Sequence, residues 1–394
     1  MLKKSILLLL ISIPLLAKTS NYIDEKNEFL AYKDSLNSEF TKYKEEQKKV
    51  FEAYKKELGV YWDEPKLSTK DSWLSYSKDK KTRSDVDFKN ETITIETIST
   101  SKKAAEQKIK MALAKVITID TKEAHNSDQL ERKLSKIKKP LGVLTSKVDA
   151  KPILSTVIFD KMPTKKSVVR YVNNKIKPRQ IKSTTSQKTK AITSNKQKPY
   201  VVYSIQVKMP QNTMIKRSRI YYQDIEKESL RQKIPKALVF AIMHSESSFN
   251  PRARSHIPAY GLMQIVPKSA GIDSYKYLYN KKRLVSGSYL YNSKNNITMG
   301  SAYLHILYYK YLRKIKNPDS RLYCTIAAYN TGAGNVAWAF TKTNNMNKAA
   351  PLINKLTPQQ VYNKLMRDLK YEEPKHYLKK VSKRMSAYNK LYKS

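Results

Sequence analysis

The sequence predicts a multidomain protein, in which an α+β amino-terminal domain is followed by an all-α carboxy-terminal domain. Its 394 residues suffice for two or three domains with cores of ordinary size. Apolar residues alternate with polar ones in several segments before residue 210, whereas long helical patterns follow Met209-Pro210. The predicted parts are a signal peptide over 1–17, an amphipathic helical segment over 18–59, an α+β accessory domain over 60–210 and an all-α domain over 211–394.

The first residues are typical of a secretory signal peptide. Two lysines precede an apolar run from Ile6 to Leu16, and Ala17 is a small residue at which a signal peptidase could cut. The run is shorter than the ~20 residues that span a bilayer, so a permanent anchor is the less favoured alternative. We expect an exported, periplasmic protein, which argues against nucleic acid as its partner.

The composition indicates a polyanionic partner. Lysine and arginine number 77 against 33 acidic residues, which gives a net charge of +44. Nucleic acid, anionic lipid and bacterial cell wall would each fit, and charge alone does not choose among them. The single cysteine, Cys324, excludes an intramolecular disulfide, and its apolar neighbours predict a buried core residue. No cysteine stands near the signal cleavage point to carry a lipid anchor.

The amino-terminal half contains helical and strand patterns. From Tyr22 to Leu58 aromatic and aliphatic residues recur every three or four positions, which predicts an amphipathic helix or helix pair facing a core or a partner. The stretch "DVDFKNETITIETI" alternates on both sides of Lys89-Asn90 and predicts a β-hairpin. A helix is expected over about 104–116, and apolar alternation recurs in "GVLTSKV", "PILSTVIF" and "YVVYSIQVKM".

A basic tract lies inside the accessory domain. Residues 161–198 contain twelve lysines or arginines and no acidic residue. Because such a composition rarely buries enough apolar surface to order itself, we expect a mobile loop or linker. Its charge either binds anionic glycan or lipid or is merely solvated, and both alternatives stay open.

Glu246 is the strongest candidate for chemistry. The segment "IPKALVFAIMHSESSFNP" predicts a helix that starts at Pro235 and stops before Pro251. Leu238, Ile242 and Glu246 are spaced four apart, so the glutamate continues the apolar face near the negative end of the helix. Partial burial and this position both raise the pKa of a carboxyl. A glutamate that stays protonated near neutrality suits the general acid of glycosidic bond cleavage, although an isolated glutamate more often just closes a helix.

Further candidate residues follow in two segments. The first holds a serine, a glycine that a ligand could approach, a flexible methionine and an amide that could hydrogen-bond a sugar. The second, "AAYNTGAGNV", presents a tyrosine and an asparagine at a helix end before a glycine-rich turn. The candidate substrate-binding residues of the two segments are Ser255, Gly261, Met263, Gln264, Tyr329 and Asn330.

The order of these motifs resembles the lytic transglycosylase family with a goose-lysozyme-like (SLT) catalytic domain. Upstream, "YWDEPKLSTKDSW" and "TRSDVDFKNETITIETI" are similar to the amino-terminal domain of one branch, the membrane-bound lytic murein transglycosylase C type. The resemblance covers most of the chain from about Tyr61, with a poor match over the basic tract. The family pattern E-S-x-F/W-N-P, S, A-x-G-L-M-Q and A-Y-N-x-G is matched by 246–251, Ser255, 259–264 and 328–332.

The resemblance implies non-hydrolytic cleavage of the β-1,4 bond between N-acetylmuramic acid and N-acetylglucosamine in peptidoglycan. Glu246 would protonate the leaving oxygen and then, as a base, take the proton of the muramic C6 hydroxyl. That hydroxyl would attack C1 and give a 1,6-anhydro product. The C type is lipid-anchored through a cysteine, which is missing here. We therefore expect either a soluble periplasmic enzyme or one that its basic tracts hold electrostatically at the outer membrane or an anionic wall polymer.

The resemblance also implies supporting roles. Ser255, Gln264 and Asn330 would hydrogen-bond the substrate or position the acid, and Tyr329 would orient the glutamate or the glycan. Met263 would line the cleft and Tyr377 would close it from the last helix, with core packing as the alternative for both. His244 points elsewhere on the helix and is interpreted as structural.

Two other functions compete with transglycosylation. Hydrolysis needs a second carboxylate. Glu246 is the only acid between residues 232 and 272, and the remaining candidates, Asp319 and Asp273, are poor. A non-catalytic wall-binding scaffold is the other alternative, but it would gain little from a desolvated acid. Neither a cofactor nor a metal is expected, because histidine is scarce and no H-E-x-x-H spacing occurs. The sequence leaves the oligomeric state open.

Overall fold

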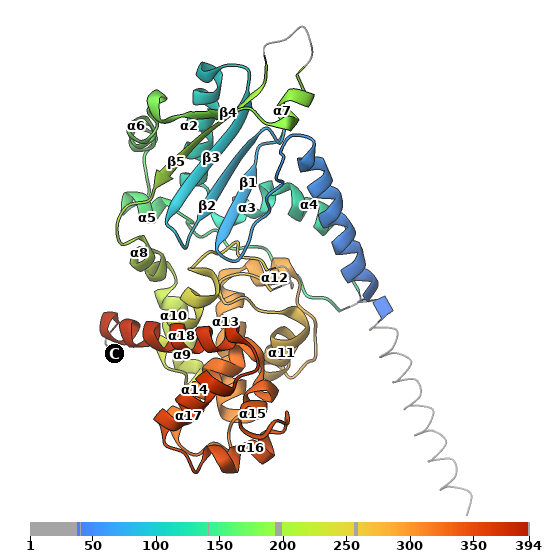
Figure 1. Ribbon diagram of the computed structural model, residues 1–394, viewed down its shortest axis with the longest axis vertical. Coiled ribbons are helices and arrows are strands. Elements are labelled where there is room, and N and C mark those ends of the chain that lie inside the picture. The colour runs from blue at the N-terminus through green and yellow to red at the C-terminus, as the bar shows by residue number, and fades with distance from the viewer. Residues whose placement is uncertain (1–37, 40, 141, 194–198, 256–258, 393–394) are drawn as a thin grey trace, which may run out of the picture.

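The computed structural model describes residues 38–39, 41–140, 142–193, 199–255 and 259–392. The predicted signal peptide and the first half of the predicted amphipathic segment lie outside these residues. The described chain forms a sheet-containing amino-terminal region and a helical carboxy-terminal region that lies below it (Figure 1). Among the described helices, none combines the length and the apolar character that crossing a membrane requires.

The amino-terminal region is built on a five-stranded antiparallel sheet. Its spatial order is β1-β2-β3-β5-β4. The predicted hairpin is confirmed, because Asp87 pairs with Thr92 and the Asp87 carboxylate accepts the amides of Lys89 and Asn90 in the turn. The alternation that predicted it places side chains of β2 and β3 in the core. The strands are β1 Ser72–Tyr76, β2 Thr82–Asp87, β3 Thr92–Ser99, β4 Lys182–Thr184 and β5 Val201–Lys208.

Helices surround this sheet. The predicted helix over 104–116 is confirmed as α2, which Ser101 caps and whose buried residues Ile109 and Leu113 pack on the sheet. Of the three other segments with apolar alternation, "YVVYSIQVKM" contains β5, whereas "GVLTSKV" forms no strand and "PILSTVIF" contains α5. The helical elements are 41–59, α2 Lys102–Thr118, α3 Thr121–Ser127, α4 Gln129–Ser135, α5 Ser155–Phe159, α6 Lys165–Lys175, η1 Pro178–Gln180 and α7 Gln187–Ala191.

The basic tract differs from its prediction as a mobile loop. Its described part carries α6, β4 and α7, and β4 pairs with β5 at the sheet edge. The reason lies in a few apolar residues among the lysines: Val172, Ile176 and Ile181 are buried in the core formed with α2. Their burial gives the tract an ordered frame that its average composition did not indicate.

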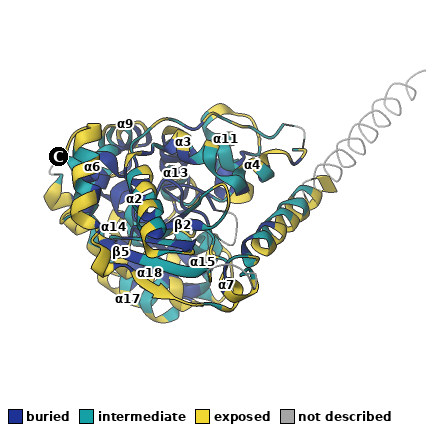
Figure 2. Ribbon diagram, turned by 90° about the horizontal axis from the view of Figure 1, so that it is seen from above, coloured by how far each residue is buried: buried dark blue, intermediate teal, exposed yellow. Residues whose placement is uncertain are grey.

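The helix over 41–59 projects from the body of the molecule, as the view from above shows (Figure 2). Only its carboxy-terminal end packs closely, where Tyr54 and Leu58 are buried beside Trp62. The described part of the predicted amphipathic stripe therefore faces the accessory domain at one end and is half-buried or exposed elsewhere.

The carboxy-terminal region is all-α. Helix α10 runs through its centre, and every residue from Leu238 to Met243 is fully buried. Helix α18 packs along α10, and Cys324 is buried in the core as predicted (Figure 1). The elements are α8 Thr213–Ile220, α9 Tyr222–Gln232, α10 Lys236–Ser247, η2 Pro267–Gly271, α11 Ile272–Tyr279, α12 Gly287–Tyr291, α13 Ser293–His305, η3 Ile306–Tyr311, α14 Pro318–Thr331, α15 Ala333–Thr341, α16 Met346–Ile353, α17 Pro358–Asp368 and α18 Glu372–Leu391.

Candidate active site

Glu246 lies in the last turn of α10 and is half-buried. Leu238 and Ile242, one and two turns earlier, are fully buried, so the glutamate does continue the apolar face. Burial raises the pKa of Glu246 to about 7, against smaller lowering effects from a hydrogen bond with Tyr377 and the charges of Lys70 and Lys380. The carboxyl therefore exchanges its proton near neutral pH, as its position on the helix predicted.

The chain turns sharply after the glutamate. Ser248 caps α10 in the left-handed conformation with φ of 52°, and Phe249 follows with φ of 62°. Both values are uncommon for residues other than glycine. The Phe249 ring is buried and stacks on Tyr221 at 6.5 Å, which stabilises the turn. The segment after Glu246 is thus directed away from the helix axis at a defined angle.

Helix α18 fixes the last turn of α10 from the side. The Tyr377 hydroxyl donates to Glu246 Oε1 at 2.6 Å. One turn later, Lys380 Nζ donates to the Ser245 carbonyl at 3.3 Å, and Arg384 donates to Ser245 Oγ at 3.0 Å. Sequence reasoning found Tyr377 and missed the two cations. Their spacing of three and seven residues from Tyr377 on one helix could have indicated a shared face.

Two hydrogen bonds attach the loop over 259–265 to the last turn of α10 and to α14. Ser247 Oγ donates to the Leu262 carbonyl at 2.7 Å, and the Tyr329 hydroxyl donates to the Met263 carbonyl at 2.8 Å. Burial raises the pKa of Tyr329 well above its usual value, and the nearby charge of Glu246 adds to this. The structure therefore brings Glu246, Tyr329 and Tyr377 close together.

Asn296 organises this loop from the core, and sequence reasoning missed it. The side chain is fully buried. Its Oδ1 accepts from the Met263 amide at 2.8 Å, and its Nδ2 donates to the carbonyls of Tyr260 and Leu290 at 2.8 Å each. No motif marks an asparagine that lies more than thirty residues from the loop it supports.

Two predicted substrate contacts are placed in the core instead. Gly261 has φ of +73°, and a Cβ there would lie 2.5 Å from the Leu290 carbonyl oxygen and the Asn296 amide. The glycine therefore permits the protein's own packing rather than the approach of a ligand. Met263 is fully buried, with its sulfur against Gly300, so the core-packing alternative holds for this residue.

The other predicted binding residues remain half-buried at the surface of the loops. Ser255 Oγ accepts the amide of Ala259 at 3.2 Å, and Gln264 Nε2 donates to the Gly261 carbonyl at 3.0 Å. Gln264 also has a left-handed backbone, with φ of 47°. Both side chains thus hold the shape of the loop after Glu246.

Comparison with known proteins fits this arrangement. Residues 223–351 match the family model described as the transglycosylase SLT domain. Residues 223–351 are therefore similar to an SLT domain. The match includes Glu246, Ser255, Gln264 and Tyr329, whereas Tyr377 lies beyond its end.

Curated relatives of the chain include two proteins called membrane-bound lytic murein transglycosylase C. That of Sodalis glossinidius is 41% identical over 189 residues, which are 48% of this chain and 52% of the relative. That of Photorhabdus laumondii is 40% identical over 190 residues, again 48% and 52% of the two chains. The chain spans about half the length of the curated relatives it matches.

A solved structure also shows a partial likeness. The 70 kDa soluble lytic transglycosylase of Escherichia coli is 21% identical and matches 46% of this chain and 26% of its own, with a TM-score of 0.36.

Asp319 and Asp273, the poor candidates for a second acid, lie on α14 and α11. Asp319 lies in the first turn of α14 and Tyr329 in its last turn, about 15 Å apart along the axis. Asp273 accepts a hydrogen bond from Tyr311 at 2.9 Å. Glu373, which the sequence analysis did not consider, lies near enough for its charge to add a small increase to the pKa of Glu246, which burial chiefly raises.

Glu373 also contacts the last predicted residue of the site. It accepts a hydrogen bond from Asn330 Nδ2 at 3.5 Å, and both side chains are accessible to solvent. Asn330 is thereby attached to the first turn of α18. Within the described ranges of the chain, no three histidine, cysteine or acidic side chains are grouped to hold a metal ion.

Proposed function

We propose that the protein is a peptidoglycan lytic transglycosylase that cleaves the bond between N-acetylmuramic acid and N-acetylglucosamine without water. The observation that carries the proposal is a half-buried glutamate with a pKa raised to about 7, at the end of a buried helix in an SLT domain. The names of the curated relatives agree with this substrate. The catalytic domain would be residues 211–394, with a lysozyme-like fold, and residues 60–210 would be its accessory domain.

The mechanism uses one carboxyl twice. Protonated Glu246 donates its proton to the glycosidic oxygen as the bond to C1 breaks. The resulting carboxylate then accepts the proton of the muramic C6 hydroxyl, whose oxygen forms the new bond to C1. Atoms balance without water, and the glutamate regains its proton. A pKa near the working pH suits both steps, because the acid and the base are then populated together.

Tyr377 supports the ionised state of this carboxyl. Its hydroxyl donates at 2.6 Å, so it stabilises the carboxylate between the two steps and keeps it aimed in one direction. Tyr329 lies near enough to feel the charge of Glu246 and orients the loop through the Met263 carbonyl. Ser255, Gln264 and Asn330, at the loop surfaces, would hydrogen-bond the glycan.

The cellular setting follows from charge and export. A protein of net charge +44 would bind anionic wall polymer or membrane surface through its lysines. The ordered part of the basic tract, with α6 and α7, presents such lysines on a fixed frame. The proposed function is remodelling and turnover of the cell wall from the periplasm.

Glu373 supports a second candidate, hydrolysis. A carboxylate beside Glu246 that activates water would give products with reducing ends. Glu373 is exposed and hydrogen-bonded to Asn330, so it is less constrained than the glutamate it would assist.

Mass spectrometry of the products distinguishes these functions. Residues 18–394 are incubated with purified peptidoglycan, with Glu246→Gln in parallel. Products that end in 1,6-anhydro-muramic acid, and that the variant does not release, would support the proposal. Reducing ends that depend on Glu373 would replace it with hydrolysis. Retention on the wall without release by either protein would mean a binding scaffold.

A further inference from the structure

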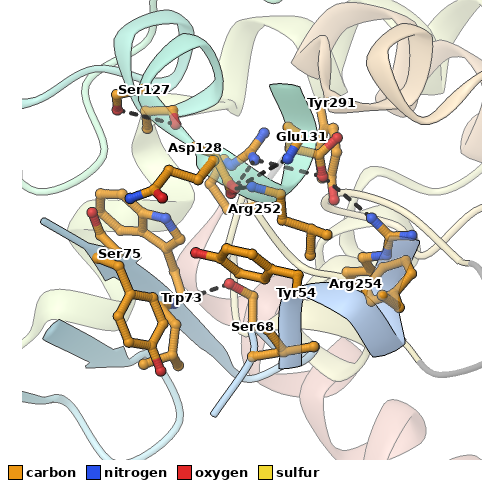
Figure 3. A pocket seen from close by; sticks show the side chains of 17 residues that line it. Tyr54, Ser68, Trp73, Ser75, Ser127, Asp128, Glu131, Arg252, Arg254 and Tyr291 are labelled. Atoms are coloured by element: carbon orange, nitrogen blue, oxygen red, sulfur yellow. Dashed lines mark hydrogen bonds and ion pairs between the residues drawn. The ribbon is translucent and has the colours of Figure 1, made fainter. Parts of the chain in front are cut away.

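The accessory domain holds the segment that follows Glu246. Figure 3 shows the side chains of Arg252 and Arg254 extending from this segment toward α4. Arg252 donates to Asp128 Oδ2 at 3.3 Å, and Arg254 donates to Glu131 Oε1 at 3.3 Å. Arg252 also lies 3.9 Å from Glu131, so the two arginines and two acids form one network across the domain contact.

The network is almost excluded from water. Arg252 is 2% exposed and Arg254 is 8% exposed. Burial alone would raise the pKa of Glu131, but Arg254 and Arg252 hold it below its usual value, so this acid is ionised. Burial and the charge of Arg252 lower the pKa of His125 to about 4. That histidine is therefore neutral at pH 7.

Aromatic rings complete the surroundings of the two guanidinium groups. Arg252 lies over the ring of Tyr291 at 4.1 Å, and Arg254 lies over Phe51 at 4.0 Å. Phe51 belongs to the projecting helix over 41–59, so that helix also contacts the network. Each arginine is consequently fixed by charge on one side and by an aromatic face on another.

The backbone of the accessory domain contacts the same segment. The Thr69 carbonyl accepts the Arg254 amide at 3.3 Å, and the Lys70 carbonyl accepts from Asn250 Nδ2 at 3.3 Å. These bonds come from the stretch just before β1. Two separate parts of the accessory domain therefore hold residues 250–254.

The held segment connects directly to the candidate active site. On one side the Asn250 amide donates to the Ser247 carbonyl at 2.9 Å, in the turn after Glu246. On the other side the Ala253 carbonyl accepts the Gly261 amide at 2.9 Å. The backbone of Arg254 forms an isolated antiparallel β-bridge with that of Tyr260, and Tyr260 forms another with Ile265. The segment thus links α10 to the loop that carries Gln264.

We propose that Asp128 and Glu131 are positioning residues for the SLT active site, which they set by holding the loop after Glu246 through Arg252 and Arg254. The inference rests on the proposed function. By this inference the accessory domain contributes to catalysis, in addition to any role in binding the enzyme to the wall or membrane. A displacement of about 1 Å in such a loop is enough to lower the rate about a hundredfold.

The test uses Glu131→Gln in the chain over 18–394, because glutamine keeps the shape and removes the charge. With soluble peptidoglycan fragments as substrate, kcat/KM is expected to fall at least about tenfold at a temperature where the variant is fully folded. Hydrogen exchange of the amides in residues 250–255 and 259–265 should accelerate, while that in residues 236–243 stays unchanged. Glu131→Asp, which keeps the charge, should retain more activity than the glutamine variant. Asp128→Asn provides a second variant should Glu131→Gln fold poorly.

The matched control is Asp224→Asn. Asp224 pairs with Lys151 at 2.9 Å and also joins the two regions of the chain, but away from the loop. Its loss should leave kcat/KM within about twofold of the wild type. Equal effects of the glutamine variant and this control would overturn the inference. Wild-type protein that releases no product would instead refute the proposed function, so the two failures are distinct.

Discussion

The hydroxyl of Tyr377 lies 2.6 Å from Glu246 Oε1, although 131 residues separate the two in the sequence. Helix α18 returns along α10 and places the phenol on the carboxyl from outside the residues that the SLT family model matches. The protonation of the candidate acid is therefore set jointly by its own helix and by the last helix of the chain.

Tyr377→Phe should shift the pH dependence of activity. The hydrogen bond lowers the pKa of Glu246, so its loss is expected to raise that pKa further above 7. The acid form then persists to higher pH, and the alkaline limb of the kcat/KM profile moves upward while the maximum rate falls about tenfold or more. Tyr371→Phe, at an exposed tyrosine just before α18, should leave the profile unchanged. An unshifted limb in the Tyr377 variant would show that the phenol does not control the acid.

Lys70→Ala tests whether the accessory domain influences the acid electrostatically. The positive charge of Lys70 lowers the pKa of Glu246, so removing it should move the alkaline limb upward, by less than in the Tyr377 variant. The shift should shrink in high salt, because Lys70 is exposed. Lys78→Ala, another exposed lysine of the same domain, is the control. Identical profiles for both variants at low salt would contradict the expected influence.

Glu246→Gln should stabilise the protein at alkaline pH. Burial raises the pKa of Glu246 from its usual 4.5 to about 7, so folding holds a proton that the unfolded chain releases. Stability is therefore lost as the pH rises from about 4.5 to about 7, by roughly 2 kcal/mol after allowance for partial exposure. Urea unfolding at pH 5 and pH 8 measures this, and the gain of the variant should appear only at pH 8. A gain of equal size at both values would point to packing instead.

Asn296→Leu should destabilise the loop over 259–265. The substitution leaves the Met263 amide and the carbonyls of Tyr260 and Leu290 without their partner in the core. A loss of about 3 kcal/mol in the free energy of unfolding is expected, because each buried unpaired group costs about 1 kcal/mol or more. Asn363→Leu, on an exposed site of α17, should change it by less than about 0.5 kcal/mol. Thermal unfolding of the two variants compares them directly.

Several predictions that depend on nearby residues in the sequence were confirmed by the structure. The helix that carries Glu246 and the hairpin at Lys89-Asn90 follow from periodicity and turn chemistry, which act over a few residues. The raised pKa of Glu246 followed from its place on that helix.

Contacts between distant segments could not be predicted in this way. Asn296 supports a loop more than thirty residues away, and no local pattern marks that pair. The spacing of Lys380 and Arg384 from Tyr377 indicates a shared helix face, but not that this face meets Ser245. Glycine and methionine occur both in ligand-binding sites and in protein cores, so the residue types of Gly261 and Met263 did not distinguish the two roles. Their close contacts with Leu290 and Gly300 show that both belong to the core. In the basic tract, the average composition is polar and basic, so it did not reveal the few apolar residues, such as Val172, that are buried.

The turn at Ser248 and Phe249 has a consequence for how this protein can vary. The backbone of Phe249 would suit glycine, which adopts a positive φ at no steric cost. The ring, however, fills a space bounded by Tyr221, Phe240 and His244. A mutation that relaxes the main chain therefore empties the core beneath the candidate acid, and one that preserves the ring keeps the awkward backbone. No single substitution both relieves the backbone strain at this position and keeps the ring in the core. Phe249 is therefore expected to tolerate little variation.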